Sequence, residues 1–176
     1  ALLLREKFGG KVTIISMGPP QAVDALKEAV SMGADEAVLL SDREFAGSDT
    51  WATAYILAQG IKKVGSFDIV LCGRQAIDGD TGQVGPGLAR QLGITQLTYV
   101  DRIVALDPGS GGITVERLLE EGREIVTARL PVLMTVLKDI NKPRFPTLSG
   151  IRRASAMKLP VWTAADLPGV DTTRMG

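Results

Sequence analysis

The sequence FDIVLCGRQAIDGDTGQVGP, residues 67–86, decides the fold of this chain. Residues 67–72 are mostly apolar and predict a strand, and the end of the stretch leads into a helix-compatible run that continues to Leu92. Four glycines lie in the connection and supply conformational freedom: Gly73, Gly79, Gly82 and Gly85. This order of strand, loop and helix indicates an anion-binding site, because the first turn of a helix has unpartnered backbone N–H groups and partial positive charge.

The loop matches neither of the common phosphate-binding motifs. A Walker loop would end in Gly-Lys-Ser/Thr, and a dinucleotide fingerprint reads Gly-x-Gly-x-x-Gly, whereas the glycines from Gly79 onward are spaced three apart. A plain strand-to-helix connection, with Asp80 or Thr81 as the helix cap, is therefore an alternative. The carboxylates of Asp78 and Asp80 repel a bare polyphosphate, but they can cap a helix or bond a ribose hydroxyl.

The composition excludes several classes of protein. The 176 residues make about one domain, and the 20 basic and 20 acidic residues cancel, which argues against a nucleic-acid-binding protein. No apolar run approaches the roughly 20 residues that cross a membrane, so we expect no membrane-embedded segment. The single cysteine, Cys72, cannot form an internal disulfide and fits a reducing compartment, so we expect a cytoplasmic protein. We expect its thiol, at the end of an apolar strand, to be buried and inert.

Histidine is absent from the sequence. The chain therefore has no imidazole for a Ser-His-Asp or Cys-His catalytic group, or for an ordinary zinc or iron site. We predict no catalytic residue and no metal site, and we expect a cofactor to carry any redox or transfer chemistry. Any such chemistry is thus expected to proceed without an imidazole acid or base from this chain.

Strands and helices alternate in the first half of the chain. Residues 2–8 read as the end of a helix, and residues 12–17 are a continuous β-branched run, typical of a strand buried on both faces of a parallel sheet. A helix over 23–33, a strand over 37–40 and a helix over 49–64 follow, before the stretch quoted above. The alternation predicts a Rossmann-like, doubly wound, mostly parallel α/β sheet of the adenine-nucleotide-binding type.

The second half begins with consecutive strands. Four segments look extended, with a hairpin-like turn between the middle two: residues 96–106, 113–119, 124–130 and 132–137. Since no helices separate them, we expect residues 94–140 to extend the sheet with antiparallel strands. We treat 1–176 as one nucleotide-binding domain, in which residues 1–93 contain the βαβ units and the glycine-rich loop.

Residues 141–158 interrupt the strand pattern. Prolines, Phe145 and Leu148 stand among basic residues and predict a loop that leads into a short basic helix. One interpretation is a solvated loop held by single apolar side chains. The other is a partner-docking loop, in which Leu148 or Phe145 is the anchor and the arginines form a polar rim.

In a doubly wound sheet, ligands bind beyond the carboxyl ends of the strands. Ser16, Met17 and Gly18 end one predicted strand, and the loop 73–85 ends another. We expect the two to be walls of one binding site.

Several motifs resemble the β subunit of the electron transfer flavoproteins. The motifs are GRQAIDGDTGQVGP at 73–86, NKPRFPTLSGIRRA at 141–154, TIISMGPPQA at 13–22 and EAVSMGADEAVLL at 28–40. They occur in the family's order, and the similarity extends from Lys11 to Gly176. The family begins with a further strand and ends with a C-terminal arm, so the resemblance implies a fragment that lacks both termini.

The resemblance implies an α/β nucleotide-binding fold and a heterodimer with an α subunit that holds the electron-carrying FAD. The β subunit itself binds AMP or, in electron-bifurcating members, a second FAD, and the pair carries electrons between acyl-CoA dehydrogenase-type enzymes and a quinone reductase or other acceptor. The form of the loop here favours FAD, because a glycine-lined helix start suits a pyrophosphate.

The resemblance also assigns residues to the two sites. The cofactor-binding residues are Ser16, Met17, Gly18, Gly73, Gln75, Ala76, Ile77, Asp78, Gly79, Asp80, Thr81, Gly82, Gln83 and Val84. The partner-docking residues are Arg144, Phe145, Leu148, Arg152 and Arg153, with Leu148 at the anchoring position. Two alternatives share the fold: a stand-alone adenine-nucleotide sensor of the stress-protein kind and an ATP-cleaving ligase domain. A stand-alone sensor would have no use for a docking loop.

Overall fold

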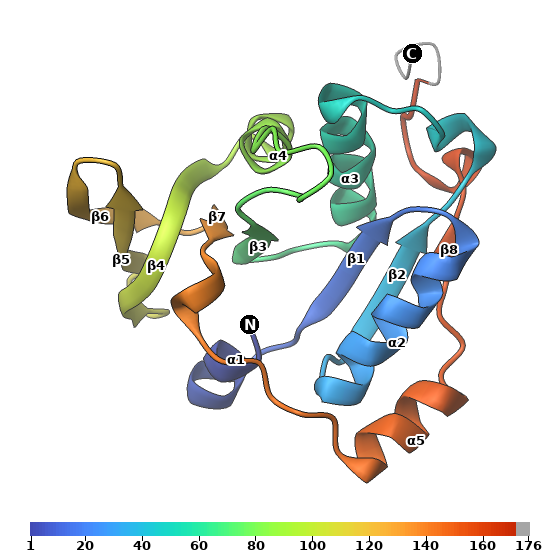
Figure 1. Cartoon of the computed structure of the whole chain (residues 1–176), viewed down its shortest axis with the longest axis horizontal. Helices are drawn as coiled ribbons and strands as arrows, with labels where there is room; N and C mark the ends of the chain where they lie inside the picture. Colours follow the sequence, from blue (N-terminus) through green and yellow to red (C-terminus); the bar gives the residue numbers. More distant parts are fainter. Residues whose placement is uncertain (172–176) are drawn as a thin grey trace. The chain divides into compact units, whose positions relative to one another are not determined.

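A computed structural model describes residues 1–171 of the chain. The chain divides into two compact units, the first from Ala1–Val64 with the segment from Pro143 onward, the second from Gly65–Lys142. Residues 172–176 lie outside the described part of the chain. Each unit is built around its own sheet (Figure 1).

The first unit is a parallel sheet between helices. Its strands are β1 (Thr13–Met17), β2 (Glu36–Leu40) and β8 (Val161–Trp162), in the order β1-β2-β8. Its helices are α1 (Leu2–Phe8), α2 (Val23–Met32), α3 (Thr50–Val64) and α5 (Leu148–Ala156), with short 3-10 turns η1 (Pro20–Ala22), η2 (Arg43–Phe45) and η4 (Ala164–Asp166). The helices and strands predicted for residues 2–64 are all present.

Both faces of β2 are buried. Val38 and Leu40 pack with Tyr55 and Ile56 of α3, while Ala37 and Leu39 pack in a second cluster with residues of α2 and α5. Alternate residues of a strand point to opposite faces, so these clusters place helices on both sides of the sheet. The predicted doubly wound α/β fold is confirmed, and Figure 1 shows α2 and α3 on either side of β1 and β2.

The prediction that residues 12–17 pack on both faces is confirmed, since Ile14 packs against one cluster and Ile15 and Met17 pack against the other, but the burial is incomplete. Every residue of β1 is only half-buried. Among the described residues β1 pairs with β2 alone, so one of its edges has no strand beside it. A strand with a neighbour on one side only keeps part of its surface exposed.

The second unit has a mixed sheet. Its elements are β3 (Ile69–Gly73), α4 (Val84–Leu92), β4 (Thr95–Asp107), β5 (Gly112–Leu119), β6 (Gly122–Arg129), β7 (Val132–Val136) and the 3-10 turn η3 (Lys138–Ile140). The order is β3-β7-β4-β5-β6. The expected antiparallel pairing is confirmed for β4, β5 and β6, including the hairpin between β5 and β6. These strands extend the sheet of β3, which is separate from the sheet of β1 and β2.

Strand β7 departs from the expected pattern. It lies between β3 and β4 and pairs with both in parallel. Val132 and Met134 belong to the hydrophobic cluster of this unit, while an added side chain at Gly85 of α4 would meet Leu133 and Thr135. A strand with neighbours on both edges and side chains buried on both faces is central in its sheet, which explains its mostly apolar sequence.

Candidate functional site

The glycine-rich loop begins where β3 ends. Arg74 N donates to Val136 O of the neighbouring β7 at 3.1 Å, and from there the loop leaves the sheet. Residues 73–81 are all exposed, and the side chain of Ile77 is 99% exposed. The loop therefore lies at the carboxyl end of a parallel strand, where this type of sheet binds ligands.

Two carboxylates of the loop are bonded within the loop itself. Asp78 Oδ1 accepts from Gly79 N at 2.9 Å, and Asp80 accepts from the amide of Gln75 while its own N–H donates to Ala76 O at 3.0 Å. Bonded donors offset part of the negative charge that opposes a phosphate. Of the two roles foreseen for these carboxylates, capping α4 does not occur in this structure.

Helix α4 begins later than a cap at Asp80 or Thr81 would require. Its N-cap is Gln83, which makes no side-chain cap hydrogen bond. Thr81 Oγ1 instead accepts from Gln83 N at 3.5 Å, at the edge of hydrogen-bonding distance. The alternative of a plain connection with Asp80 or Thr81 as the helix cap therefore does not hold, because the N-cap residue of α4 is Gln83.

At two positions of the loop, the backbone or its surroundings favour glycine over a residue with a side chain. A Cβ on Gly85 would lie 2.5 Å from Cγ2 of Thr135, so a side chain there would push α4 away from β7. Gly82 has φ +64°, a left-handed conformation that glycine adopts without strain. Together they allow a tight loop followed by close helix–strand packing, the geometry that lets a backbone approach a phosphate. The residues present thus fit a nucleotide.

The other predicted wall lies in the first unit. Ser16 and Met17 are the last residues of β1, and Gly18 N donates to Leu40 O at 3.0 Å. The side chain of Met17 packs against the cluster that contains Val38, so it is engaged in the core. That these residues share one site with the loop of the second unit stays a prediction.

The segment predicted to dock a partner exposes large apolar side chains. Phe145 is 92% exposed and Leu148 is 82% exposed. Helix α5 starts at Leu148 and is capped by Thr147, whose Oγ1 accepts from Gly150 N at 3.0 Å. Sequence reasoning missed Ile151, which is 47% exposed and lies one turn after Leu148. Its spacing of three residues from Leu148 was the available signal.

Cys72 is the thiol that sequence reasoning expected to be inert. Burial raises the pKa of the Cys72 thiol to about 11. Only the thiolate is a good nucleophile, so this cysteine is unreactive near neutral pH. Among residues 1–171 no cluster of acidic and sulfur side chains has the geometry of a metal site, and no helix is long and apolar enough to cross a membrane.

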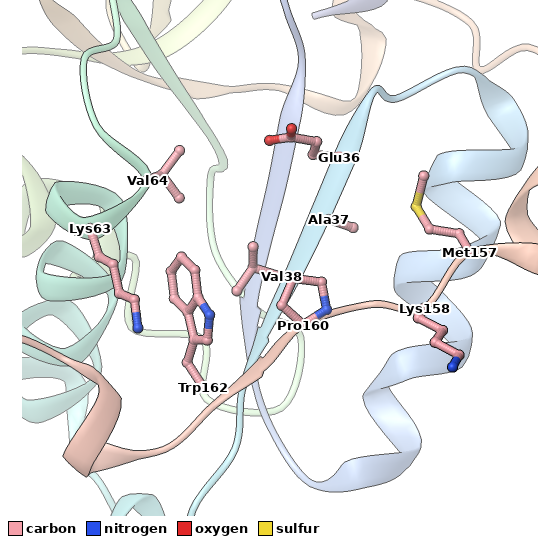
Figure 2. A pocket seen from close by; sticks show the side chains of 9 residues that line it. All are labelled: Glu36, Ala37, Val38, Lys63, Val64, Met157, Lys158, Pro160 and Trp162. Carbon is pink, nitrogen blue, oxygen red and sulfur yellow. The ribbon is translucent and has the colours of Figure 1, made fainter.

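A pocket of about 400 Å³ lies elsewhere in the first unit (Figure 2). It is lined by Glu36, Ala37, Val38, Lys63, Val64, Met157, Lys158, Pro160 and Trp162. Glu36 is the first residue of β2, so the pocket reaches the amino end of this strand, and it contains none of the predicted cofactor-binding residues. At one side of the pocket, Nζ of Lys63 lies 4.3 Å from the centre of the Trp162 ring.

Fold and loop together define a Rossmann-like α/β protein with a glycine-rich strand-to-helix loop. Sequence comparison then gives the family: the one described as "Electron transfer flavoprotein domain" matches residues 1–167. The chain belongs to the electron transfer flavoprotein family, which confirms the resemblance of its motifs.

Two relatives illustrate the similarity. The electron transfer flavoprotein subunit beta of Thermoanaerobacterium thermosaccharolyticum is 53% identical over 177 residues, which cover 100% of this chain and 66% of that protein. Protein FixA of Azorhizobium caulinodans is 47% identical over 180 residues, which cover 100% of this chain and 64% of that protein. The chain thus spans about two thirds of the length of these relatives.

Proposed function

We propose that this chain is the nucleotide-binding part of an electron transfer flavoprotein β subunit. In this proposal it pairs with an α subunit that holds the electron-carrying FAD, and the pair shuttles electrons between acyl-CoA dehydrogenase-type enzymes and a quinone reductase or other acceptor. The observation that carries the proposal is the match over the whole chain to relatives named as this subunit. The assembly and its activity belong to the whole protein, of which this chain resembles about two thirds.

The role of this chain's own residues is to bind and orient an adenine nucleotide. Backbone N–H groups at the start of α4, with the side chains of Thr81 and Gln83, hold the phosphates, and Ser16 to Gly18 contact the adenosine. The exposed loop and its self-bonded carboxylates support this assignment. A bound flavin supplies the electron transfer, because redox chemistry of this kind is carried by a cofactor and the protein binds and orients it.

The nucleotide is either AMP or a second FAD, and the glycine-lined helix start favours FAD and hence electron bifurcation. The test is the visible absorption spectrum of the native protein purified with its α subunit. Two flavins per heterodimer would establish the bifurcating type, and one flavin with one AMP would establish the simple carrier. No flavin at all would contradict the assignment.

The exposed apolar segment from Phe145 to Ile151 is proposed to dock the redox partner, with Leu148 as the anchor. Its side chains and the adjacent Arg152 fit an apolar pocket with carboxylates at its rim. Leu148→Ser should raise the KM for an acyl-CoA dehydrogenase donor at least tenfold while leaving electron exchange with a small dye unchanged. If the chain were a stand-alone nucleotide sensor, it would show no electron exchange with a dehydrogenase for Leu148→Ser to weaken. We place the complex in the cytoplasm, in line with the single inert thiol.

A further inference from the structure

The C-terminal end of α2 receives an arginine from α5. Arg153 Nη2 donates to Val30 O at 3.0 Å and also to Ala34 O. The last carbonyls of a helix have no partner within the helix and carry partial negative charge, so a guanidinium is a favourable partner there. Arg153 is therefore directed toward the protein, although sequence reasoning placed it in the rim that meets the partner.

Gly150 lets α5 approach the same end of α2. A Cβ on Gly150 would overlap the carbonyl oxygen of Ser31, a backbone atom that cannot rotate away. The buried side chain of Ala154 packs one turn further along α5 with Leu26 and Val30 of α2. Close contact and small side chains thus fix α5 against α2, and the opposite side of the helix bears the exposed Leu148.

A second tie fixes the start of the segment. The guanidinium of Arg144 donates to both carboxylate oxygens of Glu6 in α1, at 2.5 and 3.1 Å. The hydrogen bond from Arg144 holds the pKa of the Glu6 carboxyl below its usual range, so Glu6 is charged at neutral pH. Two-point pairing of this kind fixes orientation as well as distance.

Helix α1 is itself attached to the end of α2. Arg5 Nη1 donates to Gly33 O at 2.9 Å and to Asp35 Oδ1 at 2.7 Å. The docking segment is therefore held at two places, directly through α5 and indirectly through α1. Both attachments lead to residues 30–35.

We propose that Arg144 and Arg153, with Glu6 and Gly150, are positioning residues that seat the docking segment on α1 and α2, and that the redox partner meets only Phe145, Leu148, Ile151 and Arg152. This inference rests on the proposed docking function and divides its residues into two groups. Segments that bind without prior order lose affinity to the cost of ordering, so a seated segment binds its partner more tightly.

The first test exchanges the charges of the Glu6–Arg144 pair in the native flavoprotein. Glu6→Arg and Arg144→Glu should each raise the KM for the dehydrogenase about fivefold, with kcat unchanged. The double variant restores the pair in reverse and should return to within twofold of the native KM. If the double variant stays as weak as Arg144→Glu, Arg144 contacts the partner directly and the proposal is overturned.

The second test needs no partner. Ala favours a helix over Gly, so Gly150→Ala would increase the hydrogen-exchange protection of α5 if propensity alone decided. We expect the opposite, a loss of at least tenfold in the protection of α5 amides, while the matched exposed control Ser155→Ala in the same helix keeps or raises it. Protection that rises in Gly150→Ala would contradict the seating on α2.

The two tests separate this inference from the function on which it rests. If Leu148→Ser does not change the KM, the docking function fails, whatever the hydrogen exchange of α5 shows. In the other case, Leu148→Ser raises the KM, the double charge swap does not restore the native KM, and Gly150→Ala increases the protection of α5. The docking function then holds, and the proposed positioning of the segment on α1 and α2 is wrong.

Discussion

The loop between β3 and α4 and the docking segment, residues 144–153 at the start of α5, are both exposed, yet they are held in place differently. The loop bonds to itself, with Asp78 and Asp80 accepting from donors of the loop. The docking segment bonds to distant parts of the chain, with Arg144 reaching α1 and Arg153 reaching the end of α2. In the loop, shape is a local property of its sequence, whereas in the docking segment it depends on residues more than a hundred positions away.

This difference in support bears on the functions proposed for the loop and the docking segment. A self-contained loop can keep its conformation while its backbone meets a ligand, because no other element has to move with it. In the proposed docking function, a segment tied to two helices would present its apolar side chains in one arrangement to a large partner. Substitutions can therefore be chosen that break one kind of support and leave the other intact.

The largest effect is expected where the loop joins its helix. Gly85→Ala places a methyl group 2.5 Å from Cγ2 of Thr135, and Thr135 cannot turn away without losing the bond from Tyr99 N to its Oγ1, 3.0 Å long. Overpacking of this kind costs about 1–3 kcal/mol of unfolding free energy. Urea unfolding measures it, with Gly79→Ala as control because a Cβ there meets nothing within 4 Å. Equal stability of the two variants would contradict the packing described.

The next effect is on the local shape of the loop. Gly82→Ala forces an alanine into φ +64°, at a cost of about 1–2 kcal/mol. We expect nucleotide affinity to fall about tenfold, measured by calorimetry on the native protein. Gly47→Ala is the matched control, since Gly47 has φ +79° and open space around it in the other unit. The nucleotide affinity of Gly47→Ala should stay at the native value, while its free energy of unfolding should fall by as much as that of Gly82→Ala.

A smaller, pH-dependent effect is expected at the attachment of α1. Burial by itself would raise the pKa of Asp35, but the Val12 N–H and Arg5 outweigh it and hold the pKa below its usual range. A carboxyl with a lowered pKa in the folded state stabilises the fold above its unfolded pKa, and this contribution is lost as the pH falls through the folded pKa. Asp35→Asn should therefore lower the free energy of unfolding by about 1 kcal/mol at pH 7.

The same comparison at acidic pH completes that test. The difference between native protein and Asp35→Asn should shrink as the pH falls below about 4, where the unfolded carboxyl becomes protonated. Thermal unfolding between pH 7 and pH 3 follows it. A difference that stays constant over this range would mean that the charge of Asp35 does not stabilise the fold.

The smallest effect on stability distinguishes two exposed apolar residues. Ile77 in the loop and Leu148 in the docking segment are 99% and 82% exposed, so changing either to serine should alter unfolding free energy by less than about 0.5 kcal/mol. Leu148→Ser should weaken electron transfer from a dehydrogenase with the nucleotide still bound, whereas any loss in Ile77→Ser should follow loss of the nucleotide. Weakened transfer in Ile77→Ser at full nucleotide occupancy would place the loop itself in the partner's path.

The alternating half of the fold could be predicted because its signals are local. Continuous apolar strands, helical periodicity and glycine stops specified β1, α2, β2 and α3 without knowledge of the tertiary structure. Strand β7 could not be placed in the same way, since its position between β3 and β4 depends on pairing partners far along the chain. Its run of apolar residues from Val132 was nevertheless the mark of a central parallel strand.

The sites show the same limit. The glycine-rich loop was recognisable from its sequence, but the reason for Gly85 is a methyl group of Thr135 on another element. The docking segment was recognisable from exposed apolar residues among basic ones. Arg153 bonds to the end of α2, whereas Arg152 faces outward. The sequence does not distinguish the two arginines, because helix carbonyls and solvent are both favourable surroundings for a guanidinium.

The protonated state of Cys72 has a practical consequence. As the sole cysteine, with a thiol pKa of about 11, it should hardly react with maleimides at neutral pH. A cysteine introduced on the exposed side of α5 would then be the one reactive thiol of this chain, and the native cysteine could stay in place. A dye attached there would report the approach of a redox partner to the docking segment in real time.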